Sequence, residues 1–291
     1  MQIRLGEGLA GTAALEHRAI FTPDLTEYRS TPGIFATTTS ELFHSYYVVP
    51  MITKGLVKGV LEVFHHQPLQ PDPEWTDFIE ALAGQAAIAI ENNELFESLE
   101  KSNMELKHAY DATIEGWSRA LDLRDRETEG HTQRVAEITL KLANAVRVDK
   151  GSILHIRRGA LLHDIGKMGV PDQILFKEGP LDANEWEIMR KHPVFAYEML
   201  SPIKYLAPAL DIPYCHHEKW DGTGYPRGLS GEQIPLAARI FAVADVWDAL
   251  LSDRSYRKKW SKEESYAYIL ENSGTHFDPQ IVEAFTTLPD I

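Results

Sequence analysis

Histidine and carboxylate side chains recur through the second half of this 291-residue chain in a pattern that suits metal binding. Imidazole nitrogens and carboxylate oxygens, without thiolates, hold hard to borderline divalent metals. One ion normally uses fewer ligands than this set offers, so the sequence predicts a hydrolytic centre with two or three metal ions. The predicted ligands are Glu127, His131, His163, Asp164, His192, His216, His217 and Asp245.

The surroundings of these residues make them costly to bury without a partner. His163 and Asp164 follow the apolar run 160–162, and Asp245 lies inside the apolar run 241–246. An unpartnered buried polar group costs roughly 2 kcal/mol or more, and a bound metal removes that cost. A single such residue is better explained as a core histidine or a capping acid. The full set together favours a metal centre.

Helical geometry gives two pairs of these residues an expected arrangement. Glu127 and His131 are four residues apart, so one helix that included both would bring them to the same face. His216 and His217 are adjacent, and on a helix they would point about 100° apart. Asp164 has two carboxylate oxygens and can therefore bridge two ions.

The composition limits the functions that the chain can have. With 43 acidic and 29 basic side chains, the net charge is −14, which argues against a general affinity for duplex nucleic acid. The single cysteine, Cys215, excludes an intrachain disulfide framework and fits a reducing compartment, so we expect a cytoplasmic protein. No run of about 18 apolar residues is present that would span a membrane.

The first half of the chain predicts a small sheet followed by a long helix. Residues 45–51 and 56–64 are rich in β-branched and aromatic residues and predict an antiparallel hairpin with its turn at 52–55. Residues 74 to about 123 contain strong helix formers and few breakers. Two sets of apolar residues in this helix are spaced by eleven, which predicts a stripe that pairs with the same helix of a second copy. The sets are Leu95, Leu106 and Trp117, and Leu99, Tyr110 and Leu121.

The alternative for this helix is that it lies on its own domain, as amphipathic helices commonly do. From Glu127 onward the pattern is helical almost throughout. The helices are expected over 132–146, 152–165, 184–200, 213–219, 236–251, 262–271 and 279–287, the last with Asp278 as its N-cap and Pro279 at its first position.

Three motifs of the second half together resemble the HD-GYP family. They are Glu129-Gly130-His131, His163-Asp164-Ile165-Gly166-Lys167, and the stretch from His216-His217-Glu218 through Asp221-Gly222-Thr223-Gly224-Tyr225-Pro226. The resemblance covers residues 122–291 and keeps the order and spacing of the motifs. It implies an all-helical HD-type phosphohydrolase that hydrolyses the bacterial second messenger cyclic di-GMP to linear pGpG or onward to GMP.

The resemblance also implies roles for individual residues. His131, His163, Asp164, His192, His216, His217 and Asp245 match the family's metal ligands, and Glu127 matches the acid of members that hold three metals. Iron or manganese is the implied metal. Lys167 is expected to act on a metal-bound water or a phosphate oxygen, and Arg254 and Arg257 to bind phosphate. The Gly224-Tyr225-Pro226 loop is expected to border the substrate or to contact a diguanylate cyclase (GGDEF) partner, although a plain structural turn is also open.

The first part of the chain resembles a GAF sensory domain. Gly8-Leu9-Ala10-Gly11, Tyr47-Val48-Val49-Pro50-Met51 and Gly59-Val60-Leu61-Glu62-Val63 carry this resemblance, which begins partway through the usual module. It leaves open that the chain is a fragment of a longer protein. We therefore predict an α+β two-domain chain: a partial GAF-like domain with a small antiparallel sheet and helices (1–93), a connecting signalling helix (94–121) and an all-α HD-GYP domain (122–291).

The sequence-based hypothesis is a metal-dependent phosphodiesterase in which a metal-bridging hydroxide, held beside Asp164, attacks the phosphorus of cyclic di-GMP. Lys167 would assist, and Arg254 and Arg257 would hold the second phosphate. Two alternatives stay open. One is a phosphodiesterase for another cyclic dinucleotide such as cyclic GMP-AMP, and the other is a non-catalytic cyclic di-GMP receptor or scaffold.

Overall fold

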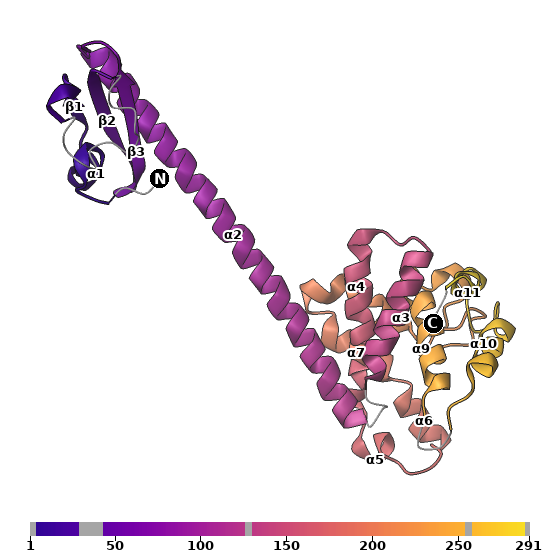
Figure 1. Ribbon diagram of the computed structural model, residues 1–291. Coiled ribbons are helices and arrows are strands. Elements are labelled where there is room, and N and C mark those ends of the chain that lie inside the picture. The colour runs from indigo at the N-terminus through magenta and orange to yellow at the C-terminus, as the bar shows by residue number, and fades with distance from the viewer. Residues whose placement is uncertain (1–3, 29–42, 126–129, 254–257, 289–291) are drawn as a thin grey trace. The chain divides into compact units, whose positions relative to one another are not determined.

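The protein forms two compact units, Met1–Leu106 and Lys107–Ile291. A computed structural model describes residues 4–28, 43–125, 130–253 and 258–288 (Figure 1). The predicted α+β class is confirmed, because a small antiparallel sheet precedes a helical unit.

The N-terminal unit is built on a three-stranded antiparallel sheet in the order β1-β2-β3. Its elements are α1 (Gly8–Glu16), β1 (Ile20–Thr22), η1 (Leu25–Tyr28), β2 (Ser45–Thr53) and β3 (Leu56–His65). The predicted hairpin is confirmed, but its turn contains two residues instead of four. Lys54 and Gly55 both have positive φ angles, 47° and 79°, as a tight two-residue hairpin turn requires. Helix α1 and strand β1 were not predicted.

Strand β2 is buried on both faces, which explains its continuous apolar sequence. Tyr46 and Val48 pack with α1 in one cluster. Tyr47 and Val49 point to the opposite face, where they pack with Ile79 near the start of α2. The sheet therefore lies between α1 and the first turns of α2 (Figure 1).

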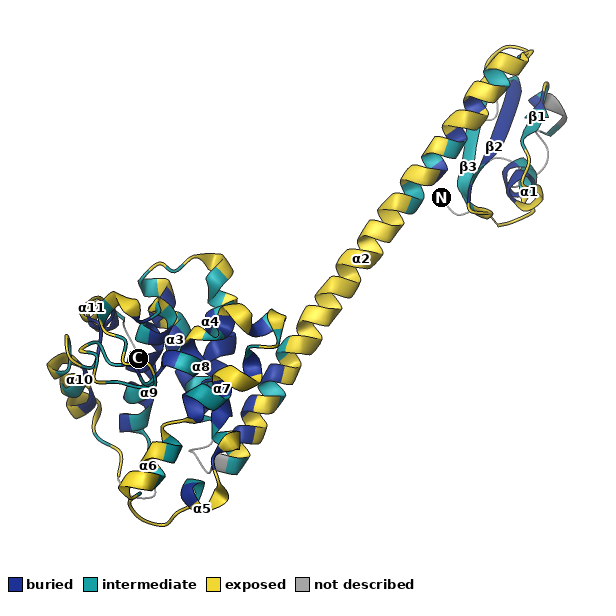
Figure 2. Cartoon of the chain, turned by 180° about the vertical axis from the view of Figure 1, so that it is seen from behind, coloured by how far each residue is buried: buried dark blue, intermediate teal, exposed yellow. Residues whose placement is uncertain are grey.

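Helix α2 (Pro73–Asp125) confirms the predicted long helix. It begins with Asp72, whose side chain accepts a hydrogen bond from the Trp75 N–H, and with Pro73 at its first position. Residues 92–110 are all exposed (Figure 2). None of the described helices combines the length and hydropathy that crossing a bilayer requires.

The C-terminal unit is helical. Its elements are α3 (His131–Ala145), α4 (Lys150–Leu161), η3 (Ile165–Gly169), α5 (Asp172–Leu175), α6 (Ala183–Met189), α7 (His192–Leu200), η4 (Lys204–Ala209), α8 (Asp211–Cys215), η5 (Gly231–Gln233), α9 (Leu236–Leu251), α10 (Lys262–Glu271) and α11 (Pro279–Thr286). The last three agree with the predicted helices to within one residue.

Three predicted helices were wrong in their extent. The helix expected over 152–165 ends at Leu161 and is followed by a separate 3-10 turn. The helix expected over 184–200 is two helices, because Pro193 can stand only in the first turn of a helix and α7 starts at His192. The helix expected over 213–219 ends at Cys215, so the helical arrangement expected for His216 and His217 is also wrong.

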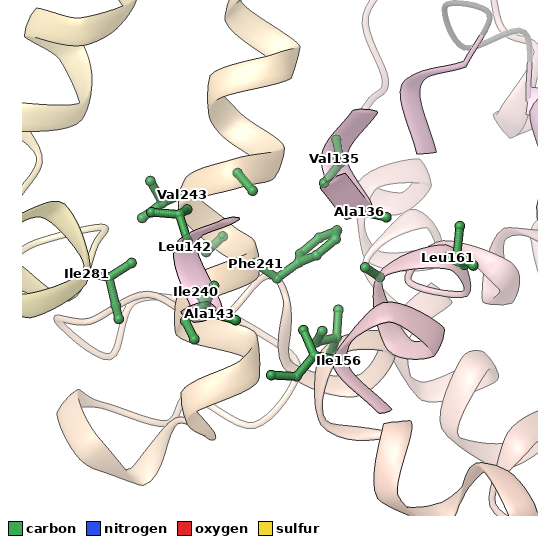
Figure 3. Packing of buried hydrophobic residues seen from close by; sticks show 14 of the residues in the cluster. Val135, Ala136, Leu142, Ala143, Ile156, Leu161, Ile240, Phe241, Val243 and Ile281 are labelled. Carbon is green, nitrogen blue, oxygen red and sulfur yellow. The ribbon is translucent and has the colours of Figure 1, made fainter. Parts of the chain in front are cut away.

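The core of this unit contains buried side chains from α3, α4, α7, α9 and α11, with further ones from α2, α8 and α10. Figure 3 shows Phe241 of α9 among side chains of α3 and α4, which include Val135, Ile156 and Leu161. These residues are almost completely buried.

Gly166 allows the closest backbone approach in the unit. A Cβ atom at this position would lie 1.8 Å from the carbonyl oxygen of His192 and 2.6 Å from the backbone nitrogen of Ala196. The 3-10 turn η3 therefore packs directly on the first turn of α7. This contact joins the segment of His163 and Asp164 to that of His192.

We expect Gly166→Ala to destabilise the protein by about 1–3 kcal/mol or more, because backbone atoms have to move to admit the methyl group. Gly116→Ala is the matched control, since nothing lies within 4 Å of its added Cβ on helix α2. The control should raise stability by about 0.5–1 kcal/mol. The urea unfolding midpoints of the two variants measure the difference, and equal midpoints would contradict the packing argument.

Candidate metal centre

The predicted ligands that the structure describes come together from five elements. His131 is the first residue of α3, His163 and Asp164 follow α4, and His192 is the first residue of α7. His216 and His217 follow α8, and Asp245 lies within α9. They form two groups whose candidate ligand atoms lie within 4.8 Å of one another. One group is Asp164, His192, His216 and His217, and the other is His131, His163 and Asp245.

Four of these imidazoles have their Nδ1 atom next to an oxygen acceptor. The His163 Nδ1 lies 2.9 Å from the Ala160 carbonyl oxygen, the His192 Nδ1 2.8 Å from that of Met189, and the His216 Nδ1 3.1 Å from that of Ile212. A carbonyl oxygen only accepts, so each Nδ1 carries the proton. When these rings are neutral, the Nε2 atoms are therefore the ones that carry the lone pair and can bind a cation.

His131 is oriented by a carboxylate instead. Its Nδ1 lies 2.7 Å from Asp248 Oδ2, and its Nε2 lies 3.4 Å from Asp245 Oδ1. A carboxylate behind a ligating histidine fixes the ring and makes the facing nitrogen more basic.

The inward-facing atoms fit a divalent cation. The Nε2 atoms of His192 and His216 lie 3.2 Å apart, although each should carry a lone pair and cannot donate to the other. Asp164 Oδ1 lies 3.3 Å from His192 Nε2 and 3.7 Å from His216 Nε2, while its Oδ2 lies 3.0 Å from His163 Nε2. Lone pairs and carboxylate oxygens that converge in this way repel one another unless positive charge lies among them.

The electrostatics of the buried cluster keep the ligands in their metal-binding forms. Burial, together with the neighbouring His192, lowers the pKa of His216 to about 3, and burial and His216 lower the pKa of His217 as well. Burial alone would raise the pKa of Asp164, but His163 and Lys167 outweigh it and lower that pKa well below its usual range. Neutral imidazoles and ionised carboxylates are the forms that bind metals.

His163 differs from His216 in its charge balance. Burial opposes its protonation, but the carboxylates of Asp164 and Asp245 outweigh burial and raise the pKa of His163. The site thus attracts a positive charge at this ring, which a divalent cation can supply in place of the proton.

Lys167 and Tyr225 lie at the edge of the cluster. The Lys167 Nζ is 2.7 Å from Asp164 Oδ2, so the 3-10 turn η3 places an ammonium group beside the central carboxylate. The Tyr225 ring stacks on His217 with its centroid 4.7 Å away. Burial, with Asp164 nearby, raises the pKa of Tyr225, which keeps its phenol protonated.

Three residues of the predicted site lie outside the described residues: Glu127, Arg254 and Arg257. Helix α3 starts at His131, directly after Gly130, whose φ of 74° is left-handed. The position of His131 is therefore fixed by the first turn of α3.

Two acids that organise the site, Asp248 and Glu218, were not predicted from the sequence. Asp248 lies one turn after Asp245 on α9, and it also pairs with the Arg134 guanidinium at 2.7 Å. Its i+3 spacing from a predicted ligand was the available signal. Glu218 is almost completely buried and accepts hydrogen bonds from the backbone N–H groups of Arg227 and Leu229.

The Gly-Tyr-Pro loop packs against the ligand segment itself. A Cβ on Gly224 would lie 2.3 Å from the Lys219 nitrogen and 2.6 Å from the His217 carbonyl oxygen. The N–H of Tyr225 donates to that same carbonyl at 3.2 Å. Glycine is thus required at this position, and the loop supports the backbone of His217.

Family comparison agrees with this geometry. A model of the HD domain matches residues 116–281, and a model of the GAF domain matches residues 1–91. This chain belongs to the HD domain family. The resemblance to HD-GYP phosphodiesterases and to a GAF domain is confirmed.

Characterised relatives of this HD domain protein share about two fifths of the aligned residues. A cyclic di-GMP phosphodiesterase of Vibrio cholerae is 39% identical over 218 residues, which are 70% of this chain and 44% of that protein. A 3'3'-cGAMP-specific phosphodiesterase 2 of the same species is 39% identical over 67% of this chain and 37% of its own length. The response regulator RpfG of Xanthomonas campestris, a cyclic di-GMP phosphodiesterase, is 40% identical over 59% of this chain and 46% of its own length. The chain thus spans less than half the length of these relatives.

We expect Asp248→Asn to weaken metal binding by about 10- to 100-fold, because the amide is a poorer acceptor for the His131 ring. Competition with a coloured chelator measures the affinity. Asp278→Asn is the matched control, since Asp278 is another buried acid paired with an arginine, Arg239, at 2.6 Å. Unchanged affinity in Asp248→Asn, or the same loss in both variants, would contradict the role of Asp248.

Proposed function

We propose that this HD domain protein is a metal-dependent phosphodiesterase that hydrolyses cyclic di-GMP to pGpG or onward to GMP. The observation that supports it best is the convergence of anchored imidazoles on Asp164, because their nitrogen and oxygen atoms lie close enough together to hold divalent cations. Relatives that carry this activity in their names are about 40% identical.

In this proposal, the ligands are His131, His163, Asp164, His192, His216, His217 and Asp245, with Glu127 as an additional one. The two groups of ligand atoms support at least two ions. A third ion is proposed because Glu127 matches the acid of family members that hold three metals. Nitrogen and oxygen ligands suit iron or manganese. When bound, the ions supply an acidified water as nucleophile and positive charge opposite the phosphodiester.

The protein's own residues divide the remaining work. Asp164 faces both groups, with Oδ1 toward His192 and Oδ2 toward His163, so its carboxylate would serve both groups of ligands when ions are bound. Lys167 neutralises charge on the attacked phosphate or delivers a proton to the departing 3′ oxygen. Tyr225 borders the substrate, and Arg254 and Arg257 bind the second phosphate.

A second substrate has specific support, because a relative specific for 3'3'-cGAMP is as similar as those named for cyclic di-GMP. Metal ligands determine the reaction, whereas base contacts determine which dinucleotide is bound. Comparing the kcat/KM values for the two nucleotides distinguishes these candidates. Tight binding without product, in protein loaded with iron or manganese, would instead favour a receptor or scaffold.

We expect anaerobically purified, metal-loaded protein to convert cyclic di-GMP to pGpG, and His163→Ala with Asp164→Ala to abolish this turnover. The double variant loses a ligand and the bridging carboxylate. Chromatography identifies the product, and elemental analysis gives the metal content. Turnover that persists in the double variant would refute the assignment of the site.

We propose that the chain forms a homodimer through α2. Leu95, Leu99 and Leu106 are 56%, 61% and 53% exposed on one stripe of the helix, which supports a second copy as the partner. The stripe does not continue freely to the end of α2, because Leu121 is buried in its own unit and Tyr110 stacks on Tyr205. The Gly224-Tyr225-Pro226 loop is the proposed contact for a GGDEF partner.

We expect Leu95→Glu with Leu99→Glu to convert the dimer to a monomer, because it places like charges directly in the interface. Lys101→Glu lies off the stripe and serves as the control that keeps the dimer. Sedimentation equilibrium measures the mass of each. A monomeric parent protein, or a double variant that stays dimeric, would refute the interface.

A further inference from the structure

A row of aromatic and cationic side chains leads from the metal centre to the surface. The Tyr225 ring stacks on His217, and the Cζ atom of Arg190 lies 5.5 Å from the centroid of Tyr225. The same Cζ lies 5.9 Å from the centroid of Trp186, a ring that is 46% exposed. The row thus begins at a proposed metal ligand and ends in solvent.

The backbone explains why Arg190 stands at this place. Helix α6 starts with a capping box between Asp182 and Glu185, and it ends at Met189. Trp186 and Arg190 are four residues apart on it, so they share one face, and the Arg190 N–H donates to the Trp186 carbonyl oxygen. The carbonyl oxygen of Met189, the last residue of α6, accepts a hydrogen bond from the His192 ring. One helix end therefore positions both a proposed ligand and this arginine.

The positive charge of Arg190 is not neutralised by an ion pair within the part of the chain that the structure describes. No carboxylate pairs with it among the residues that the structure describes, although the chain carries 43 acids. Its guanidinium lies near the faces of two aromatic rings, and Arg190 as a whole residue is exposed. A planar guanidinium on aromatic supports is held with its N–H edge free to donate.

We propose that Arg190, supported by Trp186 and Tyr225, is the specificity-determining residue that binds the guanine base next to the phosphodiester at the metal centre. The inference rests on the proposed function and names its base-recognition site. Guanine presents O6 and N7, two acceptors that match the two parallel donors of arginine, whereas adenine presents a donor beside N7. The flanking rings give the ribose and the base an apolar surface on the path out of the site.

The test compares three variants of the full, manganese-loaded chain with the parent protein. Arg190→Ala should raise the KM for cyclic di-GMP by about 5- to 150-fold, with kcat and metal content retained. Arg190→Lys keeps the charge but loses the two parallel N–H donors of the guanidinium group, so its KM for cyclic di-GMP should stay raised. Arg227→Ala removes a similar arginine, which lies over Tyr214, and should leave KM unchanged.

Three results would overturn the inference: a KM that Arg190→Ala does not change, a full recovery by Arg190→Lys, or a loss of metal in Arg190→Ala. If the parent protein turns over no cyclic dinucleotide, the proposed function fails. The dissociation constants of cyclic di-GMP for the parent and Arg190→Ala then decide the inference, and equal constants or no binding would overturn it.

Discussion

The structure of the centre depends on the orientation of imidazoles that are buried next to carboxylates. Each of the rings of His163, His192 and His216 uses Nδ1 to bind a carbonyl of its own chain segment three or four residues earlier. This local contact costs little and fixes the ring without a distant partner. Because the contact uses the Nδ1 proton, the opposite nitrogen is committed to the centre.

The fold also has to hold several short ligand-bearing segments close together in fixed positions. Phe241 contacts the rings of His163 and His216, with centroids 4.8 and 5.9 Å away, so the apolar core supports the ligands directly. Gly166 lets η3 lie against α7, and Gly224 lets its loop lie on the carbonyl of His217. Two of these contacts are between backbones, which makes the positions of the ligands insensitive to side-chain rotamers.

The parts of the site that sequence could predict are those with local signals. Polar residues inside apolar runs, such as His163 and Asp245, indicated burial with a partner, and the sequence motifs indicated their common purpose. The end of α8 at Cys215 was not predicted, because the residues that follow it have no strong helix breaker before Gly222. Asp248 and Glu218 were missed for another reason. Their partners, His131 and the N–H groups of a loop, are set by tertiary contacts that spacing does not encode.

The last turns of α2 belong to the C-terminal compact unit, which begins at Lys107. Arg158 on α4 is buried, and its guanidinium binds Asp111 of α2 at 2.8 Å and the Tyr205 hydroxyl. Ile114 of α2 is part of the same core as α4. Asp111 is partly exposed, but Arg158 is almost completely buried, so removal of Asp111 would leave a buried charge with less compensation and destabilise the unit.

This pairing bears on how the connecting helix can influence the centre. Helix α4 ends at Leu161, two residues before His163, so the Arg158–Asp111 ion pair ties α2 to the helix that leads into the segment of the central carboxylate. A truncation just before Asp122 would leave Arg158 without Asp111 and would weaken the unit for reasons unrelated to signalling. A cut at Lys107, the boundary of the compact unit, retains this ion pair and isolates the influence of the N-terminal unit.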